Sequence, residues 1–348
     1  MHTQTTVEVP GAPEIAGLSF RVFSGSDDYE AMSRIVAESS TVDQDDSAQT
    51  VEDIERSYRH LMNSDPATDM VFAEIHGKVV GYCRVYWFQV EDGPRVYNQF
   101  VHLTPSWRGK GIRLAMLQWC ENRNREIGAE HTDCGEQRLS AWAGDVETDW
   151  LRLLETEGFK PIRYDFEMVR DNVDDIPDLP LPEGLEVRPV CTEDVRKVWD
   201  AACEAFRDHW DYSEDEWSEE ELKGWMESDV WQPDLWQVAW DGDEVAGMVL
   251  NFIDEKQNKK HERKRGYTET ICVRRPYRRR GLARALIARS LQVHKDQGMT
   301  ETALGVDTEN PSGALQLYQS MGYEMVKRYA VYRKPLTKMD STMGEDSG

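Results

Sequence analysis

Basic side chains are few in this sequence relative to acidic ones, and long apolar segments are missing. The chain has 41 Lys and Arg against 65 Asp and Glu, which gives a formal net charge of −24 at pH 7. A field of this sign repels phosphate backbones and anionic lipid headgroups. No run approaches the roughly 20 apolar residues that a membrane span requires. We therefore expect neither nucleic acid nor a membrane as a partner.

Signals for export and for metal binding are also missing. Residues 1–17 contain no basic stretch followed by an apolar one, as a secretory signal would, so we expect a cytoplasmic protein. The cysteines are scattered and form no CxxC pair, which argues against a zinc site or a disulfide framework. We expect no metal, and buried, reduced thiols. The six are Cys83, Cys120, Cys134, Cys191, Cys203 and Cys272.

The length and an internal repeat predict two domains. The 348 residues exceed a typical core of roughly 150 residues. Four landmarks recur in the same order at offsets of 164 to 170 residues: 17–21 at 184–188, 76–81 at 241–247, 107–111 at 277–281, and 158–159 at 322–323. A proline-rich acidic segment separates the copies and disfavours regular structure. The predicted parts are a flexible N-terminus (1–16), domains at 17–172 and 184–336, a linker (173–183) and a tail (337–348).

Each copy shows alternating strand and helix patterns. In the second copy the periodicity predicts a helix, a hairpin, a long strand, a helix, a short strand and a last helix. Asn310 is predicted to cap that last helix, with Pro311 in its first position. The ranges are 193–207, 235–254, 267–273, 282–295, 302–306 and 310–322. This order indicates a mixed α/β fold with ligand chemistry at strand ends and helix N-termini.

The turn at 278–283 has the form of a phosphate-binding device. It joins a strand to a helix whose first N–H groups lack partners and carry partial positive charge. Gly281 and the small Ala283 leave the backbone accessible to a pyrophosphate. A tight turn with solvated arginines is the alternative interpretation.

Two motifs in order resemble the GNAT N-acetyltransferase superfamily. Its coenzyme A motif begins with Arg or Gln and continues with Gly and then Gly or Ala, matched here by Arg278, Gly281 and Ala283. Its second pattern is matched by Asn310, Ala314, Tyr318, Gly322 and Tyr323. The resemblance implies an α/β chain of two tandem acyl-CoA N-acyltransferase domains. Each would have a mixed, mostly antiparallel central sheet flanked by helices.

The resemblance also implies an activity and its residues. We expect acetyl-CoA as cosubstrate and direct transfer of its acetyl group to a primary amine of a small molecule in a ternary complex. Glu269 would be the general base and Tyr318 the acid that protonates the departing thiolate. Backbone N–H groups near Ile271 and Val273 would polarise the thioester carbonyl, while Asn310 would contact the coenzyme or cap its helix. The expected coenzyme-binding residues are Ile271, Val273, Arg278, Arg279, Arg280, Gly281, Leu282, Ala283 and Asn310.

The first copy lacks these groups. Gln99 replaces Glu269, Leu154 replaces Tyr318 and Val146 replaces Asn310, so the N-terminal domain is predicted to be degenerate and silent. Arg113 stands at the position of Ala283, where it would either block a pyrophosphate or pair with it. If the first copy does bind the coenzyme, its site would comprise Leu103, Arg108, Gly109, Lys110, Gly111 and Ile112.

The acceptor is less well defined by the sequence. Acids and aromatics alternate in 207–217, which suits an ammonium substrate or an exposed acidic loop. The substrate residues proposed there are Asp208, His209, Trp210 and Asp211. The basic run 259–265 is expected in a solvated turn, or against an acidic substrate or a coenzyme phosphate.

Other functions remain open from the sequence. A protein or peptide acetyltransferase would need an open groove, and a non-catalytic acyl-CoA sensor would not need Glu269 and Tyr318. The tandem layout with an active C-terminal copy is similar to that of the mycothiol synthases, although no motif identifies their substrate. Duplication can satisfy internally the pairing that single-domain relatives obtain by dimerising, so a monomer is preferred and a dimer stays open.

Overall fold

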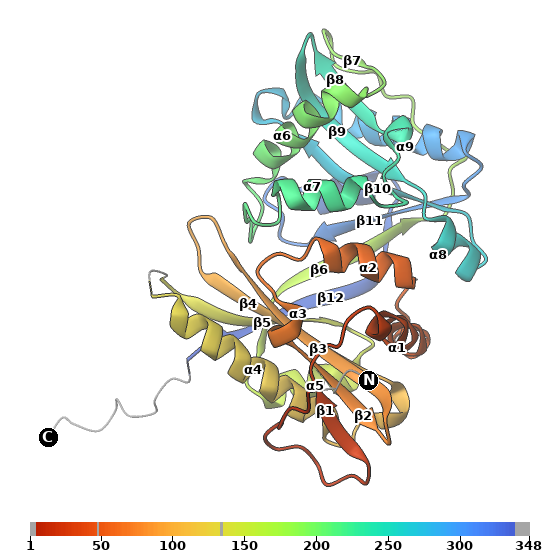
Figure 1. The fold of residues 1–348 in the computed structure, drawn as a ribbon. Coiled ribbons are helices and arrows are strands. Elements are labelled where there is room, and N and C mark those ends of the chain that lie inside the picture. Colours follow the sequence, from red (N-terminus) through yellow and green to blue (C-terminus); the bar gives the residue numbers. More distant parts are fainter. Residues whose placement is uncertain (1–4, 47–48, 133–134, 338–348) are drawn as a thin grey trace, which may run out of the picture. The chain divides into compact units, whose positions relative to one another are not determined.

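The computed structural model describes residues 5–46, 49–132 and 135–337, which divide into two compact units (Figure 1). Unit 1 comprises Met1–Ile162 and Ala330–Gly348, and unit 2 comprises Arg163–Tyr329. Each unit is built on one sheet with helices packed against it, as the repeat predicts.

In unit 1 the strands follow the order β1-β2-β3-β4-β5-β12. Neighbours from β1 to β4 are antiparallel and β4 pairs parallel with β5. The elements are β1 (Leu18–Arg21), α1 (Asp27–Asp43), α2 (Val51–Arg59), α3 (Pro66–Asp69), β2 (Met70–Ile75), β3 (Lys78–Gln89), β4 (Arg95–Leu103), η1 (Pro105–Trp107), α4 (Ile112–Glu130), β5 (Gln137–Gly144) and α5 (Thr148–Thr156).

In unit 2 the order is β6-β11-β10-β9-β8-β7. Only the β10–β11 pair is parallel among the ladders of this unit's described residues. The elements are β6 (Lys160–Arg170), β7 (Glu186–Val187), η2 (Thr192–Asp194), α6 (Val195–Phe206), α7 (Glu219–Met226), η3 (Pro233–Leu235), β8 (Gln237–Asp241), β9 (Glu244–Phe252), α8 (Glu255–Lys260), β10 (Arg265–Val273), η4 (Arg275–Tyr277), α9 (Leu282–Asp296), β11 (Glu301–Asp307), α10 (Ala314–Ser320) and β12 (Glu324–Pro335).

The last strand of each repeat completes the unit of the other repeat. β6, at the end of the first copy, pairs antiparallel with β11 from Thr302↔Arg170 to Asp307↔Asp165 in unit 2. β12 passes into unit 1 at Ala330 and follows β5 in that sheet. The compact units therefore differ from the repeats, and the repeat boundaries at 17–172 and 184–336 stay predictions.

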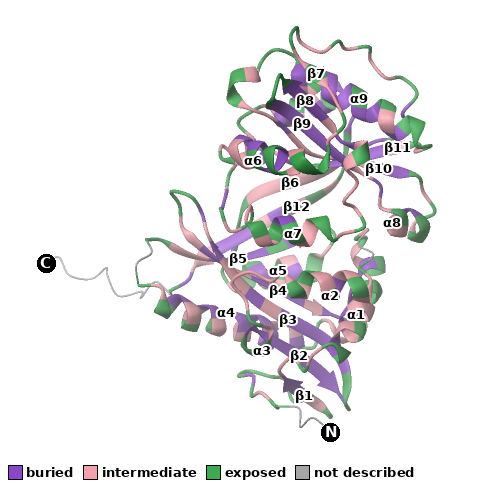
Figure 2. Cartoon of the chain, turned by 45° about the horizontal axis from the view of Figure 1, so that its top comes forward, coloured by how far each residue is buried: buried purple, intermediate pink, exposed green. Residues whose placement is uncertain are grey.

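The core of unit 2 lies on both faces of its sheet. Leu286, Ile287 and Leu291 of α9 belong to one buried cluster, and Val198 and Ala202 of α6 to another. β9 contributes to both clusters, and successive residues of a strand point to opposite faces, so α6 and α9 cover opposite sides. Figure 2 shows the result as a largely buried β9, and seven of its nine residues are buried.

Three local expectations are corrected by the structure. Residues 5–16 are not free of the fold, because Thr6 bridges Arg21 and Val9 is buried. The last predicted helix begins at Ala314, since Asn310 accepts hydrogen bonds from Ser312 and closes a turn instead of capping a helix. The run 259–265 is not a simple turn: Lys259 and Lys260 end α8 and Arg265 begins β10.

The cysteines of the described residues are unpaired. Cys83, Cys120 and Cys272 are buried, Cys203 is half-buried and Cys191 is exposed. Cys191 therefore departs from the prediction of buried thiols, and Cys134 lies outside the described residues.

Candidate active site

The turn before α9 leaves a helix N-terminus accessible. Gly281 has φ +85° and begins the helix without a side-chain cap. A Cβ added there would meet no atom within 4 Å, so the space beside the turn is open. Leu282 anchors the helix in the core with 1% exposure. Free N–H groups next to open space form a suitable place for an anion.

The arginines of this turn have different roles in the structure. Arg278 donates to the Val273 carbonyl at 2.9 Å and to Asp208 Oδ2 at 2.7 Å, so its side chain braces the turn. Arg279 is exposed and takes a left-handed φ of 61°. Arg280 donates to the Glu183 carbonyl. Backbone N–H groups and Arg279 are thus the donors best placed for a phosphate.

β10 carries a bulge next to this turn. Its ladder with β9 pairs Glu269 with Leu250 and Cys272 with Met248, which leaves one extra residue on β10. Thr270 sits in the bulge with φ +48°, a conformation that is costly for a β-branched residue. The ladder with β11 covers only Arg265–Tyr267. Ile271 therefore lies outside both ladders as the described residues define them.

Glu269 lies at the start of the bulge and is half-buried. Burial raises the pKa of its carboxyl group to about 7, partly offset by a hydrogen bond from the Gly305 N–H at 3.1 Å. The negative charge of Glu167 raises the pKa further. A carboxylate that titrates near neutrality is suited to accepting a proton at physiological pH.

Tyr318 lies on α10 and is 5% exposed. Burial raises the pKa of its phenol well above the usual range, and the negative charge of Glu269 raises it further. Its hydroxyl therefore stays protonated at neutral pH. Tyr323 has a different role, because its hydroxyl joins Thr268 and Thr302, both at 2.9 Å.

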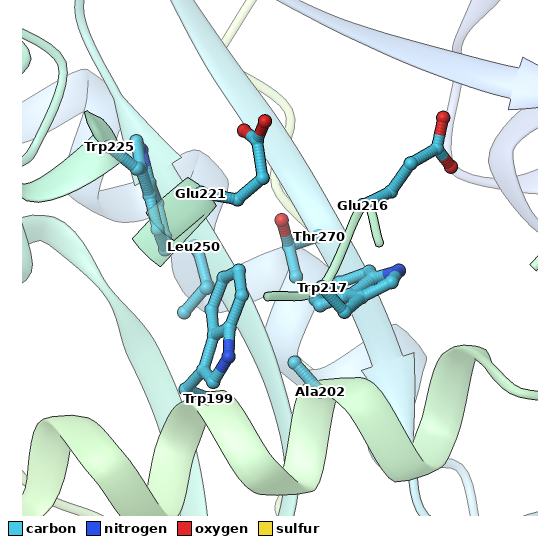
Figure 3. Close-up of a pocket in the computed structure, with 8 residues that line it drawn as sticks. All are labelled: Trp199, Ala202, Glu216, Trp217, Glu221, Trp225, Leu250 and Thr270. Carbon is cyan, nitrogen blue, oxygen red and sulfur yellow. The ribbon is translucent and has the colours of Figure 1, made fainter. Parts of the chain in front are cut away.

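A cavity of about 310 Å³ opens beside the bulge (Figure 3). Its walls come from α6, the segment before α7, α7 itself, β9 and β10. The lining residues are Trp199, Ala202, Glu216, Trp217, Glu221, Trp225, Leu250 and Thr270. Glu269 is not among the lining residues, but its ladder partner Leu250 is. Directly opposed residues of an antiparallel pair point to the same face of the sheet, so the carboxyl group lies on the cavity's side of the sheet.

The substrate residues expected at 208–211 do not line this cavity. Asp208 forms ion pairs with Arg275 and Arg278, and these hydrogen bonds hold the pKa of its carboxyl group below the usual range. His209 packs on Phe206 with ring centroids 4.3 Å apart. Trp210 lies against Arg163, and Asp211 adopts a left-handed φ of 60°.

Sequence reasoning missed most of the cavity's walls. Trp199 and Trp225 were not singled out because each lies on a helix where core packing is the ordinary role of a tryptophan. Glu216 and Trp217 fell inside the segment 207–217 that was considered for substrate binding. Thr270 carried no signal, because a bulge depends on pairing with a second strand.

The equivalent region of unit 1 is filled. Arg113 donates to the Val101 carbonyl at 3.1 and 3.2 Å and to Glu147 at 3.4 Å, and it stacks over Trp150 at 4.2 Å. Burial lowers the pKa of its guanidinium to about 10. A Cβ at Gly111 would lie 3.4 Å from Pro13. The N-terminal segment therefore covers this turn, whereas the turn at Gly281 is open.

The other residues of the second coenzyme prediction also have structural contacts. Arg108 donates to Asp43 at 2.5 and 2.6 Å and to the Leu103 carbonyl, as Arg278 does to Asp208 and Val273. Lys110 lies over Trp107, Gly109 has φ +71° and Ile112 is buried. β4 pairs with β3 without a register shift, so the bulge of β10 has no counterpart here.

An open helix N-terminus, a carboxyl group titrating near neutrality and a protonated phenol in one unit are the parts of a group-transfer enzyme. The sequence profile of the acetyltransferase (GNAT) family matches residues 30–143 and 199–323. The chain belongs to this family and is an acyltransferase of the GNAT type, whose members use acetyl-CoA as cosubstrate.

Individual proteins agree with this assignment. A mycothiol acetyltransferase of Geodermatophilus obscurus is 26% identical over 276 residues, covering 77% of this chain and 83% of that protein. A GCN5-related N-acetyltransferase from Sphaerobacter thermophilus is similar in structure, with a TM-score of 0.69 at 25% identity over 92% of this chain and 96% of that one. A tandem GNAT protein from the clavulanic acid biosynthesis pathway gives 0.66 at 15% identity over 93% and 100%.

No helix among the described residues is long and apolar enough to cross a membrane. Within the same ranges, no group of three or more His, Cys, Asp or Glu side chains is arranged to hold a metal ion.

Proposed function

We propose that unit 2 of this chain transfers the acetyl group of acetyl-CoA to a primary amine of a small molecule, by direct attack in a ternary complex. The observation that carries the proposal is Glu269, a carboxyl group with a pKa of about 7 at the start of the bulge in β10, opposite Leu250 of the cavity wall. A cytoplasmic, monomeric enzyme is part of the same proposal.

The residues of unit 2 suit the coenzyme. The N–H groups at the start of α9 and the side chain of Arg279 would hold its pyrophosphate, in the open space beside Gly281. The ladder between β10 and β11 ends at Tyr267, and beyond it the β11-facing edge of β10, near Ile271 and Val273, would take the pantetheine arm and polarise the carbonyl. Bound acetyl-CoA would supply the acetyl group as a thioester. Asn310 is committed to Ser312, which favours shaping of the loop over a coenzyme contact.

Glu269 would remove the proton from the incoming ammonium group, directly or through water. Its pKa of about 7 leaves a useful fraction ionised at neutral pH, and the Gly305 N–H fixes one carboxylate oxygen. Tyr318 would donate its phenolic proton to the departing sulfur, because burial keeps that proton in place until it is needed. Proton transfer by a positioned side chain contributes typically about 10²–10⁴-fold each.

Unit 1 is proposed to bind no coenzyme and to carry no chemistry. Arg113 and Pro13 take up the space at its turn, and Gln99, at the position of Glu269, is buried and accepts from Asn124. The small-molecule acceptor is supported by the relative named mycothiol acetyltransferase, whose own substrate is not transferred to this chain.

The test is acetyl-CoA-dependent acetylation of a panel of primary amines and of peptides, followed by mass spectrometry. Glu269→Gln and Tyr318→Phe should each lower kcat by about 10²-fold or more, while Glu324→Gln, an exposed carboxyl group on β12, and Tyr29→Phe in unit 1 should not. Transfer to peptides alone would favour a protein acetyltransferase. If Glu269→Gln and Tyr318→Phe both transfer acetyl groups as fast as the wild type, the proposed roles of Glu269 as base and Tyr318 as acid are wrong.

A further inference from the structure

The cavity beside Thr270 has a predominantly aromatic wall. Trp199 of α6, Trp217 of the segment before α7 and Trp225 of α7 line it together with Leu250 of β9 (Figure 3). Trp199 is 9% exposed and Leu250 2% exposed, so these two surfaces are dry. At about 310 Å³ the cavity is at the small end of ligand pockets.

The tryptophans are held in place by further aromatic contacts. Trp217 packs between Trp199 and Phe206, with ring centroids 5.1 and 4.9 Å apart. Trp225 stacks on Trp236 at 5.3 Å. Rings that are braced in this way keep their faces toward the cavity, and such faces attract apolar groups and cations.

Only acidic charges line the cavity. Glu216 and Glu221 are exposed, and their carboxyl groups point away from α6 (Figure 3). No Lys, Arg or His is among the lining residues. An entering carboxylate or phosphate would meet repulsion with no compensating cation, whereas an ammonium ion would be attracted.

We infer that the cavity selects acceptor amines with an apolar, preferably aromatic, carbon body and without an anionic group. This inference rests on the proposed acetyl transfer. The indoles would hold the carbon body, Glu216 and Glu221 would attract the cation, and the amino group would reach Glu269 past Thr270. Sugar-like bodies are disfavoured, because the indole and Leu250 walls offer few partners for buried hydroxyl groups.

The experiment compares kcat/KM for three primary amines with acetyl-CoA. The probes are 2-phenylethylamine, phenylalanine, which adds one carboxylate to the same body, and glucosamine, which has a polar body. We expect 2-phenylethylamine to exceed both others by about 10-fold or more, a difference of roughly 1.4 kcal/mol. Equal or better turnover of phenylalanine or glucosamine would overturn the inference.

Variants locate the effect in the cavity. Trp217→Ala should raise KM for 2-phenylethylamine by about 5- to 30-fold, the range of a desolvated cation–π contact. Trp217→Phe, which keeps an aromatic ring, should have a KM close to that of the wild type.

A second set of variants tests the acidic charges. Glu216→Gln with Glu221→Gln should reduce the preference for 2-phenylethylamine over phenylalanine. Glu255→Gln with Glu324→Gln makes the same charge change outside the lining and should leave this preference unchanged. If the Glu216→Gln, Glu221→Gln double variant keeps the full preference for 2-phenylethylamine over phenylalanine, the proposed electrostatic selection against anionic amines is contradicted.

A binding measurement separates this inference from the proposed function. Calorimetric titration of 2-phenylethylamine into the protein saturated with coenzyme A needs no turnover. Binding that Trp217→Ala weakens supports the cavity assignment even if no amine is acetylated, in which case the proposed function alone fails. If other amines are acetylated but 2-phenylethylamine does not bind, the cavity assignment is contradicted and the proposed function is still supported.

Discussion

Glu269 lies in a different environment from its counterpart in the other repeat, Gln99. It is half-buried beside a bulge, and burial raises the pKa of its carboxyl group to about 7. Gln99 in the first repeat is buried and accepts from Asn124. One difference between the repeats therefore exchanges a titratable carboxyl group for a neutral amide whose oxygen accepts a hydrogen bond.

The pH profile follows from this pKa. Because the base must be ionised, kcat/KM should rise with pH and level off above about 7. Glu269→Gln should lower kcat/KM by about 10²–10⁴-fold and remove this acidic limb. Steady-state kinetics between pH 5.5 and 8.5 measure both effects. A wild-type profile that is flat across this range would contradict the role of Glu269.

The same shift has a consequence for stability. A carboxyl group whose pKa is higher in the folded than in the unfolded protein destabilises the fold as pH rises through the two values. Glu269→Gln should therefore raise Tm relative to wild type at pH 8 and raise it less at pH 5. Thermal unfolding at the two pH values measures this, with Glu324→Gln as the control that should show no such difference.

At the scale of elements, the two units differ in the strand before the turn, and the proposed function depends on this difference. β10 has a bulge and β4 has none, although the two strands occupy equivalent places in the repeat. The sequence motifs predicted the strand, the turn and α9, since these follow from local periodicity and from Gly281. The bulge could not be predicted, because it depends on how β10 pairs with β9.

The proposed acceptor site was likewise only partly predictable from the sequence. The segment 207–217 was recognised from its acids and aromatics, but Asp208 turns to Arg278 and only Glu216 and Trp217 of that segment reach the cavity. The remaining walls come from α6, α7 and the sheet. Tertiary packing decides which face of a tryptophan-rich helix lines a cavity. The local sequence of the helix does not show which face this will be.

Thr270→Gly tests whether the bulge is strained. A non-glycine residue in the left-handed region costs roughly 1–2 kcal/mol, more than the roughly 0.5–1 kcal/mol of extra chain entropy that glycine brings. Tm should therefore rise by about 1–4 °C. Thr300→Gly, at an exposed position without a positive φ, should lower it. A fall in Tm for Thr270→Gly would show that the bulge is not strained.

At the scale of the whole molecule, the chain is two repeats whose last strands are exchanged. Arg265 of unit 2 pairs with Glu167 of β6 at 3.0 Å, and Arg163 pairs with Asp307 at 2.6 Å. In unit 1, Lys334 of β12 pairs with Glu121 at 2.6 Å. The sequence repeat predicted two similar folds but gave no indication of this exchange. The recurring segments show that the two copies are related, but they do not show which strands pair.

Cleavage of the linker should therefore leave the protein in one piece. A protease site inserted after the exposed Asp178 would cut the chain between the repeats. The two fragments should co-elute on size exclusion under native conditions, because each completes the sheet of the unit that the other forms. Separation of the fragments into two folded species without denaturant would contradict the exchange.

The most direct test of the central claim is calorimetric titration of acetyl-CoA into three proteins. Gly281→Trp obstructs the open turn of unit 2, and Gly111→Trp is its matched control, because both glycines have φ +85°. The account predicts one site in the wild type, lost in Gly281→Trp and retained in Gly111→Trp. Two sites in the wild type, or one site that survives Gly281→Trp and is lost in Gly111→Trp, would contradict it.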